Sequence, residues 1–407
     1  MMSPIRLLNP SFFFGLLLLC LGLPGCKQPT AAFPIPAQQD LDALKMEFAP
    51  DKRVAIFEIT PALINKKWVL NGQTNQPGAL EALKKAVASW EMTPAPELNI
   101  ALLPAADLAE KTWGIVNVSV CNIRSEAGHS KELSTQALLG TVIRVYKKEG
   151  EWSLIQTPDQ YLGWLDPGGF IAVSGEEAEK WQQSSRLIFT ADYGIARSEP
   201  DQGSLPVGDL VTGDILLDLG REGNWARLGY PDGRTAWAPA AELTSYTDWL
   251  ADRDPVTANI LATANTFIGR PYLWGGASPK GMDCSGFTKT VYYLNGLVLP
   301  RDASQQVTAG EEVPTDSTLT NLVPGDFLFF GRKATTDQKE KITHVGIYIG
   351  DGRMIHSGAD NPGVRIQSLR RGDPDFAPHR LETLVRARRM TPGENGVGKL
   401  EDVKLAD

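Results

Sequence analysis

The sequence predicts a multidomain protein in which two small antiparallel β-barrels precede a domain that combines helices with β-strands. An internal repeat predicts the barrels, because six Gly, Trp, Pro and Asp residues of the segment 140–164 recur 73 positions later, in the segment 213–237. A cysteine at the start of an amphipathic helix, followed by two histidines on a hairpin, predicts the last domain. The 407 residues leave room for several domains, each with its own core.

Composition and charge narrow the choice of partners. Hydrophobic residues make up 42% of the chain and charged residues 22%, which is ordinary for a globular protein. The formal net charge of -8 opposes binding to polyanions, so we expect no nucleic-acid partner. Two of the four cysteines lie in the leader, which leaves no disulfide framework.

Residues 1–26 have the organisation of a signal peptide, with the cation Arg6, an apolar run over 12–23 and a small-residue ending. The apolar run is too short to span a bilayer comfortably. The segment LPGC at 23–26 resembles a bacterial lipobox, whose cysteine becomes the lipidated first residue of the mature chain. We therefore expect an exported lipoprotein held on a membrane of the cell envelope through Cys26. An ordinary signal peptide that is cleaved nearby is the alternative.

Residues 27–110 are expected to combine a tether with a mixed α/β region. A strand is predicted over 53–59, and apolar residues at helical spacing predict a helix over 78–90. The repeat then divides the chain into two units, residues 111–178 and 179–250. In both units, short alternating apolar stretches are interrupted by Gly, Pro and Asp, which is typical of a small antiparallel barrel. This pattern resembles bacterial SH3-like domains.

The chemistry lies in residues 251–390. A helix over 256–268 ends at Gly269, and a second helix contains Cys284 in its first turn, with Asp283 as the N-cap. Unpaired backbone N–H groups and the positive end of the helix dipole favour a thiolate, so they are expected to lower the pKa of the cysteine. The same N–H groups can hold the oxyanion that forms during acyl transfer.

Two histidines can serve this cysteine as a base and as the group that orients the base. His344 and His356 lie on two predicted strands, joined by a turn at residues 350–352. A three-residue loop places Gly346 opposite His356, so that both imidazoles line one face of the hairpin. A two-residue turn would place them on opposite faces. We assign Cys284 as the nucleophile, His344 as the base and His356 as its orienting partner.

Less specific interpretations compete with these assignments. A lone buried cysteine is most often a small core residue, and a buried histidine on a strand can be a satisfied core residue. His379 lies beside an arginine in a Pro-rich segment, which is typical of a surface position. A zinc site would need a CxxC motif or a third clustered ligand, and neither is present in the sequence. We predict that no metal and no other cofactor is required.

Five segments of residues 255–390 together resemble the NlpC/P60 cysteine peptidases. These segments are PYLWGG at 271–276, DCSGF at 283–287, PGDF at 324–327, HVGIY at 344–348 and HSG at 356–358. The resemblance implies a papain-like α+β fold, in which a helix with Cys284 packs on an antiparallel sheet that carries His344 and His356. It also implies hydrolysis of bacterial cell-wall peptides.

The order of an N-terminal region, two SH3-like units and a peptidase further resembles γ-D-glutamyl-L-diamino acid endopeptidases, which act on peptides with a free N-terminal L-Ala. This resemblance implies that Glu126, Tyr161 and Asp302 hold the ammonium group of the substrate. Asp283 and Ser285, on either side of the cysteine, are predicted to contact the substrate as well. The expected reaction releases L-Ala-γ-D-Glu from peptides derived from peptidoglycan.

The residue types of this pocket suit an ammonium group, which carries three donors and one charge. A longer peptide would lack that charge and leave the carboxylates unpaired. Ala303 stands where the subgroup often has a serine, so one substrate hydrogen bond is expected to be missing.

Two other functions fit the same sequence. One is a general peptidoglycan D,L-endopeptidase with an open cleft that acts on the intact wall. The other is a non-catalytic wall-binding lipoprotein with a vestigial peptidase domain. We expect a monomer, and the Gly-rich, charged segment 391–407 is predicted to be disordered.

Overall fold

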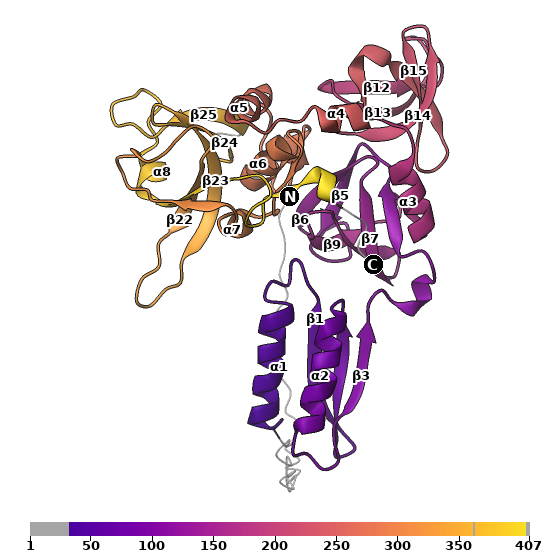
Figure 1. Ribbon diagram of the computed structural model, residues 1–407, viewed down its shortest axis with the longest axis vertical. Coiled ribbons are helices and arrows are strands. Elements are labelled where there is room, and N and C mark those ends of the chain that lie inside the picture. Colours follow the sequence, from indigo (N-terminus) through magenta and orange to yellow (C-terminus); the bar gives the residue numbers. More distant parts are fainter. Residues whose placement is uncertain (1–31, 361–362, 404–407) are drawn as a thin grey trace, which may run out of the picture.

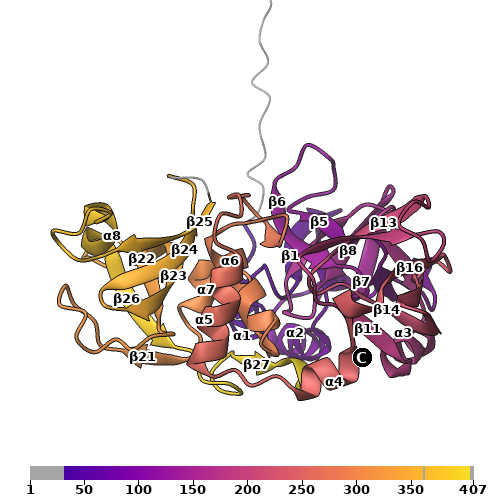
Figure 2. The ribbon, with the colours of Figure 1, turned by 90° about the horizontal axis from the view of Figure 1, so that it is seen from above.

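The computed structural model describes residues 32–360 and 363–403 of the chain, so the predicted signal peptide and Cys26 lie outside the described residues. Figure 1 shows a narrow N-terminal unit that projects away from the rest of the molecule. Two β-rich units and a larger C-terminal unit lie at its other end. From above, the C-terminal unit and the β-rich units lie side by side (Figure 2).

The N-terminal unit is a small α/β layer. Its elements are α1 (Ile35–Phe48), β1 (Phe57–Ile64), β2 (Lys67–Thr74), α2 (Pro77–Ser89) and β3 (Glu97–Leu102). β2 pairs antiparallel with β1 and parallel with β3, and the helix expected over 78–90 is confirmed as α2. The strand expected over 53–59 begins later, because the carbonyl of Asp51 accepts hydrogen bonds from the N–H groups of Val54 and Ala55 and forms a turn.

The expected tether does not extend through this region, because the chain is helical from Ile35, where α1 begins. Ala37 and Leu41 are its buried residues, so its apolar pattern is weak in the sequence.

The two β-rich units have the same topology. The first contains β4 (Trp113–Val116), β5 (Val120–Arg124), β6 (Leu133–Leu138), β7 (Val142–Glu149), β8 (Trp152–Gln156), β9 (Leu162–Leu165) and β10 (Phe170–Val173). After α3 (Gly175–Gln183), the second contains β11 (Arg186–Phe189), β12 (Tyr193–Arg197), β13 (Pro206–Val211), β14 (Ile215–Glu222), β15 (Trp225–Gly229), β16 (Thr235–Pro239) and β17 (Leu243–Ser245). Each strand of the second unit begins 73 residues after its counterpart in the first, and the strand order in the two sheets is the same. The repeat is therefore structural.

The C-terminal unit packs helices against a six-stranded antiparallel sheet of order β21-β26-β22-β23-β24-β25. Its helices are α4 (Tyr246–Ala251), α5 (Thr257–Thr266), α6 (Cys284–Tyr293), α7 (Ala303–Gln306) and α8 (Pro378–Glu382). The strands of the sheet are β21 (Glu311–Val313), β22 (Phe327–Arg332), β23 (Lys341–Gly350), β24 (Arg353–Gly358), β25 (Gly363–Ser368) and β26 (Leu384–Arg389). Three short pieces, β18 (Ala277–Ser278), β19 (Gly281–Met282) and β20 (Leu297–Val298), flank α6.

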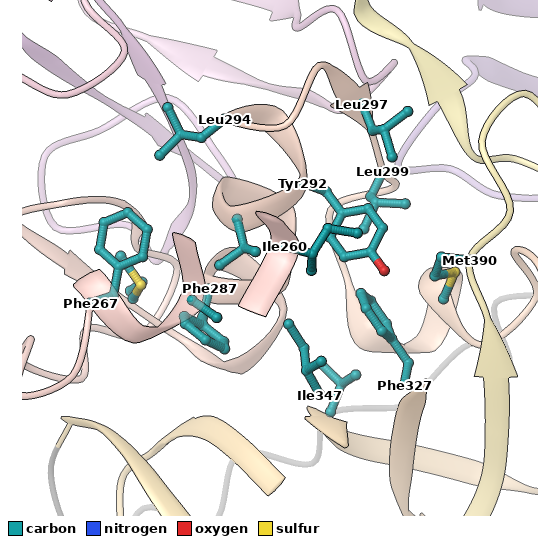
Figure 3. Close-up of a cluster of buried hydrophobic side chains, with 14 of the residues drawn as sticks. Ile260, Phe267, Phe287, Tyr292, Leu294, Leu297, Leu299, Phe327, Ile347 and Met390 are labelled. Atoms are coloured by element: carbon teal, nitrogen blue, oxygen red, sulfur yellow. The ribbon is translucent and has the colours of Figure 1, made fainter. Parts of the chain in front are cut away.

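The core between α6 and the sheet fixes the position of the cysteine. Phe287 and Val291 of α6 are fully buried and belong to one apolar cluster with Phe327 of β22 and Ile347 of β23. Figure 3 shows Phe287, Phe327 and Ile347 within this cluster. Full burial of one such side chain contributes about 1.5–3 kcal/mol to stability. Because such buried side chains pack α6 against the sheet, the helix that begins at Cys284 lies against β23.

The tail after Met390 was predicted to be disordered, and this prediction is wrong for residues 391–403. Val397 is 1% exposed, and β27 (Gly398–Lys399) pairs antiparallel with β20. Hydrogen bonds from Gly310 to Asn395 and from Leu400 to Gly296 add to these contacts and order a segment whose composition is typical of a solvated tail. In the described part of the chain, no helix is long and apolar enough to cross a bilayer.

Candidate active site

Cys284 lies at the N-terminus of α6, as predicted. The side chain of Asp283 accepts a hydrogen bond of 2.7 Å from the Gly286 N–H and caps the helix. The thiol is buried, and the backbone N–H groups of Val345 and Ser285 hydrogen-bond to it. The contact with Val345 places the sulfur beside the position on β23 that carries His344.

The expectation of a lowered pKa at Cys284 is wrong. Burial, together with the neighbouring Asp283 carboxylate, raises the pKa of the Cys284 thiol to about 12. The two backbone N–H groups and Arg301 oppose this shift, but they do not replace the hydration that the sulfur loses. The sulfur is therefore a neutral thiol in the free protein.

The two histidines form a buried pair. The Nε2 atom of His344 lies 2.8 Å from the Nδ1 atom of His356, and the rings are nearly perpendicular, at 88°. Burial lowers the pKa of His344 well below its ordinary value and that of His356 to about 3, so both imidazoles are neutral. His356 engages the Nε2 atom of His344. The Nδ1 atom of His344 is therefore the ring nitrogen that remains to accept a proton from a thiol.

The hairpin that carries the histidines has the predicted register but not the predicted turn. Ile347 pairs with Ile355, as the three-residue loop requires. The turn is instead the two-residue kind, with φ of 51° and 67° at residues 351 and 352. A bulge at Ile349 adds the missing residue and returns both histidines to one face.

Asp283 is fully engaged within the protein. Its carboxylate accepts hydrogen bonds from Arg301 at 2.6 and 3.0 Å, from the N–H groups of Gly275 and Gly286, and from the Ser285 hydroxyl at 3.3 Å. Ser285 also accepts a hydrogen bond of 2.9 Å from Arg301. These bonds fill the acceptor sites of the carboxylate. Asp283, which we predicted to contact the substrate, is therefore placed to organise the loop around the cysteine.

Arg301 links this loop to the first β-rich unit, a connection that the sequence does not reveal. The guanidinium is 1% exposed, and its Nε donates to the Thr135 hydroxyl of β6 at 3.0 Å. Nearby, the Ala277 N–H donates to the Gln136 side chain at 3.0 Å. Gly275 has a φ of 77° and lies so close to the β6 backbone that a Cβ atom would collide with it. The first unit thus supports the cysteine loop.

The structure brings together two of the three residues of the predicted ammonium pocket. The Tyr161 hydroxyl donates to the Asp302 carboxylate at 3.1 Å, and burial raises the pKa of Tyr161, so this hydroxyl stays neutral. Glu126 is not with them. Its carboxylate pairs with Lys131 at 2.5 Å on an exposed loop.

A cation from the N-terminal unit already occupies Asp302. The Nη1 atom of Arg53 donates to Asp302 at 2.7 Å and to the Ser304 hydroxyl at 2.8 Å. Asp51 binds the same guanidinium, and the carbonyl of Arg53 accepts a hydrogen bond of 2.7 Å from the Leu162 N–H in the first β-rich unit. Three parts of the chain therefore meet at this carboxylate. No motif in the sequence marks Arg53, because its partner lies 249 residues away.

Comparison with known proteins identifies the family. The profile of the NlpC/P60 family matches residues 269–375, and the profile of a bacterial dipeptidyl-peptidase SH3 domain matches residues 123–168. A γ-D-glutamyl-L-lysine dipeptidyl-peptidase from Bacillus cereus is 32% identical over 273 residues, which cover 65% of this chain and 77% of the relative. The chain belongs to the NlpC/P60 family.

Other relatives agree with this assignment. A γ-D-glutamyl-L-lysine dipeptidyl-peptidase from Bacillus subtilis is 29% identical over 251 residues, 58% of this chain and 76% of the relative. The crystal structure of an NlpC/P60 family protein from Bacillus cereus superposes with a TM-score of 0.57 at 26% identity, and covers 68% of this chain and 99% of that one. The protein is thus a multidomain NlpC/P60 hydrolase of cell-wall peptides with an SH3-like domain.

Acid is expected to destabilise the NlpC/P60 domain through its two buried histidines. Both have folded-state pKa values below the ordinary 6.5, so below pH 6.5 the unfolded chain binds protons that the folded domain does not. Their contribution is complete above pH 6.5 and is lost as the pH falls toward about 3, where His356 titrates in the folded protein. The loss approaches about 1.4 kcal/mol per pH unit for each histidine.

Urea unfolding at pH 7 and pH 5 measures this loss. His356→Asn should reduce the difference in unfolding free energy between the two pH values, whereas Gln338→Asn, which changes no ionisable group at an exposed position, should leave it unchanged. An equal pH dependence in the wild type and in His356→Asn would contradict a lowered pKa of His356 in the folded protein.

Proposed function

We propose that this NlpC/P60 peptidase hydrolyses the bond between γ-D-Glu and the L-diamino acid in cell-wall peptides with a free N-terminal L-Ala, and releases L-Ala-γ-D-Glu. The contact between Tyr161 and Asp302 carries the proposal. It joins the first β-rich unit to the C-terminal unit at a carboxylate that is suited to an ammonium group. Arg301, the neighbour of Asp302, binds Asp283 beside the nucleophile. The carboxylate is thus linked directly to the cysteine loop.

The Cys284 thiol and the His344 imidazole are both neutral in the free protein, which suggests how the reaction begins. The Cys284 sulfur attacks the carbonyl carbon of the scissile bond while its proton passes to Nδ1 of His344. Backbone N–H groups at the start of α6 stabilise the oxyanion. The protonated His344 then gives its proton to the departing amine, and a thioester remains. A water molecule, deprotonated by His344, hydrolyses this thioester and restores the thiol.

The ammonium pocket limits the substrate to short peptides. We propose that Asp302 accepts hydrogen bonds from the ammonium group and that the Tyr161 hydroxyl lies against it. Glu126 becomes the third member when its ion pair with Lys131 opens, which its exposed position permits. Ser285 remains a candidate substrate contact through its hydroxyl.

The second β-rich unit is, in this proposal, another SH3-like barrel, and its role is to support the cysteine loop. Its topology and its 73-residue offset from the first unit favour this assignment. Lys280, which lies between Gly275 and Cys284, pairs with Asp209 of the second unit at 2.5 Å and donates to Ser119 of the first at 2.8 Å. The domains would then span residues 111–178, 179–250 and 251–390.

We also propose that the enzyme is a monomeric lipoprotein of the cell envelope, held on a membrane by an acylated Cys26. The charged and apolar order of residues 1–26 supports this proposal. Mass spectrometry of the mature protein from its native membrane would detect the added acyl mass.

The activity is tested with one defined peptide, L-Ala-γ-D-Glu-L-diaminopimelate, and its L-lysine counterpart. Mass spectrometry should detect L-Ala-γ-D-Glu and the free diamino acid from at least one of them. Cleavage at another bond, or no cleavage of either peptide, would contradict the proposal. Efficient cleavage of intact peptidoglycan would favour a general endopeptidase instead.

A further inference from the structure

A further polar side chain, that of Gln367, extends the hydrogen-bonded pair of His344 and His356. The Nε2 atom of His356 lies 3.1 Å from the Oε1 atom of Gln367 on β25. The pairing of β24 with β25 explains this contact: His356 faces Arg365 and Met354 faces Gln367, so Gln367 is the diagonal neighbour of His356 on the same face. His344, His356 and Gln367 therefore form a continuous series of hydrogen-bonded side chains.

We propose that Gln367 is a positioning residue that fixes the tautomers of both histidines, so that His344 presents an unprotonated Nδ1 to Cys284. This inference rests on the proposed function, in which His344 is the base. It concerns a residue that lies outside the three proposed catalytic groups.

The inference follows from donors and acceptors. An amide oxygen only accepts, so His356 must carry its proton on Nε2 and leave Nδ1 bare. That bare nitrogen then accepts from Nε2–H of His344 at 2.8 Å. A neutral His344 with its proton on Nε2 has a free lone pair on Nδ1. If the amide NH₂ of Gln367 faced His356 instead, every proton would move to the other ring nitrogen, and His344 could not act as the base.

The charges around His356 suit an amide at this position better than a carboxylate. Burial, Arg365 and Arg380 lower the pKa of His356, whereas Asp360 and the hydrogen bond that His356 donates to Gln367 raise it. Asp360 is itself bound by both arginines, at 3.0 and 3.4 Å. A neutral acceptor therefore orients His356 without protonating it. A carboxylate at position 367 would stabilise an imidazolium and remove the acceptor that His344 needs.

The first test measures the tautomers directly. Imidazole ¹⁵N chemical shifts of the full-length protein, assigned with His344→Asn and His356→Asn, should show both histidines neutral with the proton on Nε2. Gln367→Met removes the acceptor, and the two imidazoles should then exchange between tautomers. A proton on Nδ1 of His344 in the wild type, or unchanged spectra in Gln367→Met, would overturn the proposal.

The second test measures turnover of the defined tripeptide. Gln367→Met should lower kcat by about 10- to 100-fold with little change in KM, a loss typical of groups that orient a catalytic residue. Gln367→Glu should keep the acceptor and move the acid limb of the kcat profile to higher pH, which a merely structural residue would not do. Gln338→Met, at an exposed loop position, is the matched control.

A folded Gln367→Met variant with wild-type kcat, or a Gln367→Glu variant with an unshifted acid limb, would refute the role of Gln367. Failure of the wild-type enzyme to release L-Ala-γ-D-Glu from the defined tripeptides would instead refute the proposed function. The ¹⁵N shifts would still test Gln367 in that case, so the two failures are distinguishable.

Discussion

Cys284→Ala is expected to lower the release of L-Ala-γ-D-Glu by at least about 10⁴-fold, because covalent catalysis loses the atom that forms the thioester. The remaining oxyanion-stabilising groups cannot supply a nucleophile. The change should leave the fold intact, since Cys284 is one small residue in a large apolar cluster and the lost sulfur costs on the order of 1 kcal/mol. Product release is measured by mass spectrometry under single-turnover and steady-state conditions.

The chain offers a matched control for this variant. Cys121 is the other free cysteine among the described residues, and it is also buried, in the core of the first β-rich unit. Cys121→Ala should lower stability by a similar amount and keep kcat within about twofold of the wild type, because surrounding packing rather than chemistry is altered. Thermal unfolding of both variants separates the two effects. Undiminished product release in Cys284→Ala would disprove the nucleophile assignment.

Acetylation of the substrate's N-terminus is expected to lower kcat/KM by about 10²-fold. The acetyl group removes the positive charge and brings an amide to a pocket that contains a partly buried carboxylate, at a cost of about 1–3 kcal/mol. The loss stays within this range, which corresponds to about 5- to 150-fold, because Arg53 at 2.7 Å still neutralises Asp302. Initial rates with the free and the acetylated tripeptide measure the ratio.

Variants of the pocket should change this ratio in a specific way. Asp302→Asn should weaken turnover of the free tripeptide and affect the acetylated one little, so that discrimination narrows. Asp337→Asn, on an exposed loop of the same domain, should change neither rate. Equal rates for both peptides with the wild-type enzyme would rule out an ammonium pocket and favour an open cleft.

Local patterns made much of this fold predictable. The helix with Cys284, the hairpin with both histidines and the tandem repeat each depend on residues that are close together in the sequence, where spacing and turn chemistry decide the structure. The turn of the hairpin was mispredicted because a bulge and a shorter turn give the same register as a longer loop. Register alone therefore does not determine the turn type.

Properties that depend on the assembled molecule were not predictable. The ion pair between Arg53 and Asp302 and the bond from Arg301 to Thr135 join residues far apart in the sequence, and neither leaves a periodic signal. The direction of the pKa shift at Cys284 depends on how completely the domain buries the sulfur. A helix terminus is visible in a sequence, but the loss of solvent around it is not.

The contacts of Arg53 connect three parts of the chain at one point. The loop that carries Arg53 is fastened to the first β-rich unit by its backbone and to the catalytic domain by its side chain. The narrow N-terminal unit in Figure 1 is therefore coupled to both of its neighbours beside Asp302. Loss of this ion pair would remove a cationic partner from the Asp302 carboxylate and strengthen the attraction of that carboxylate for an ammonium group.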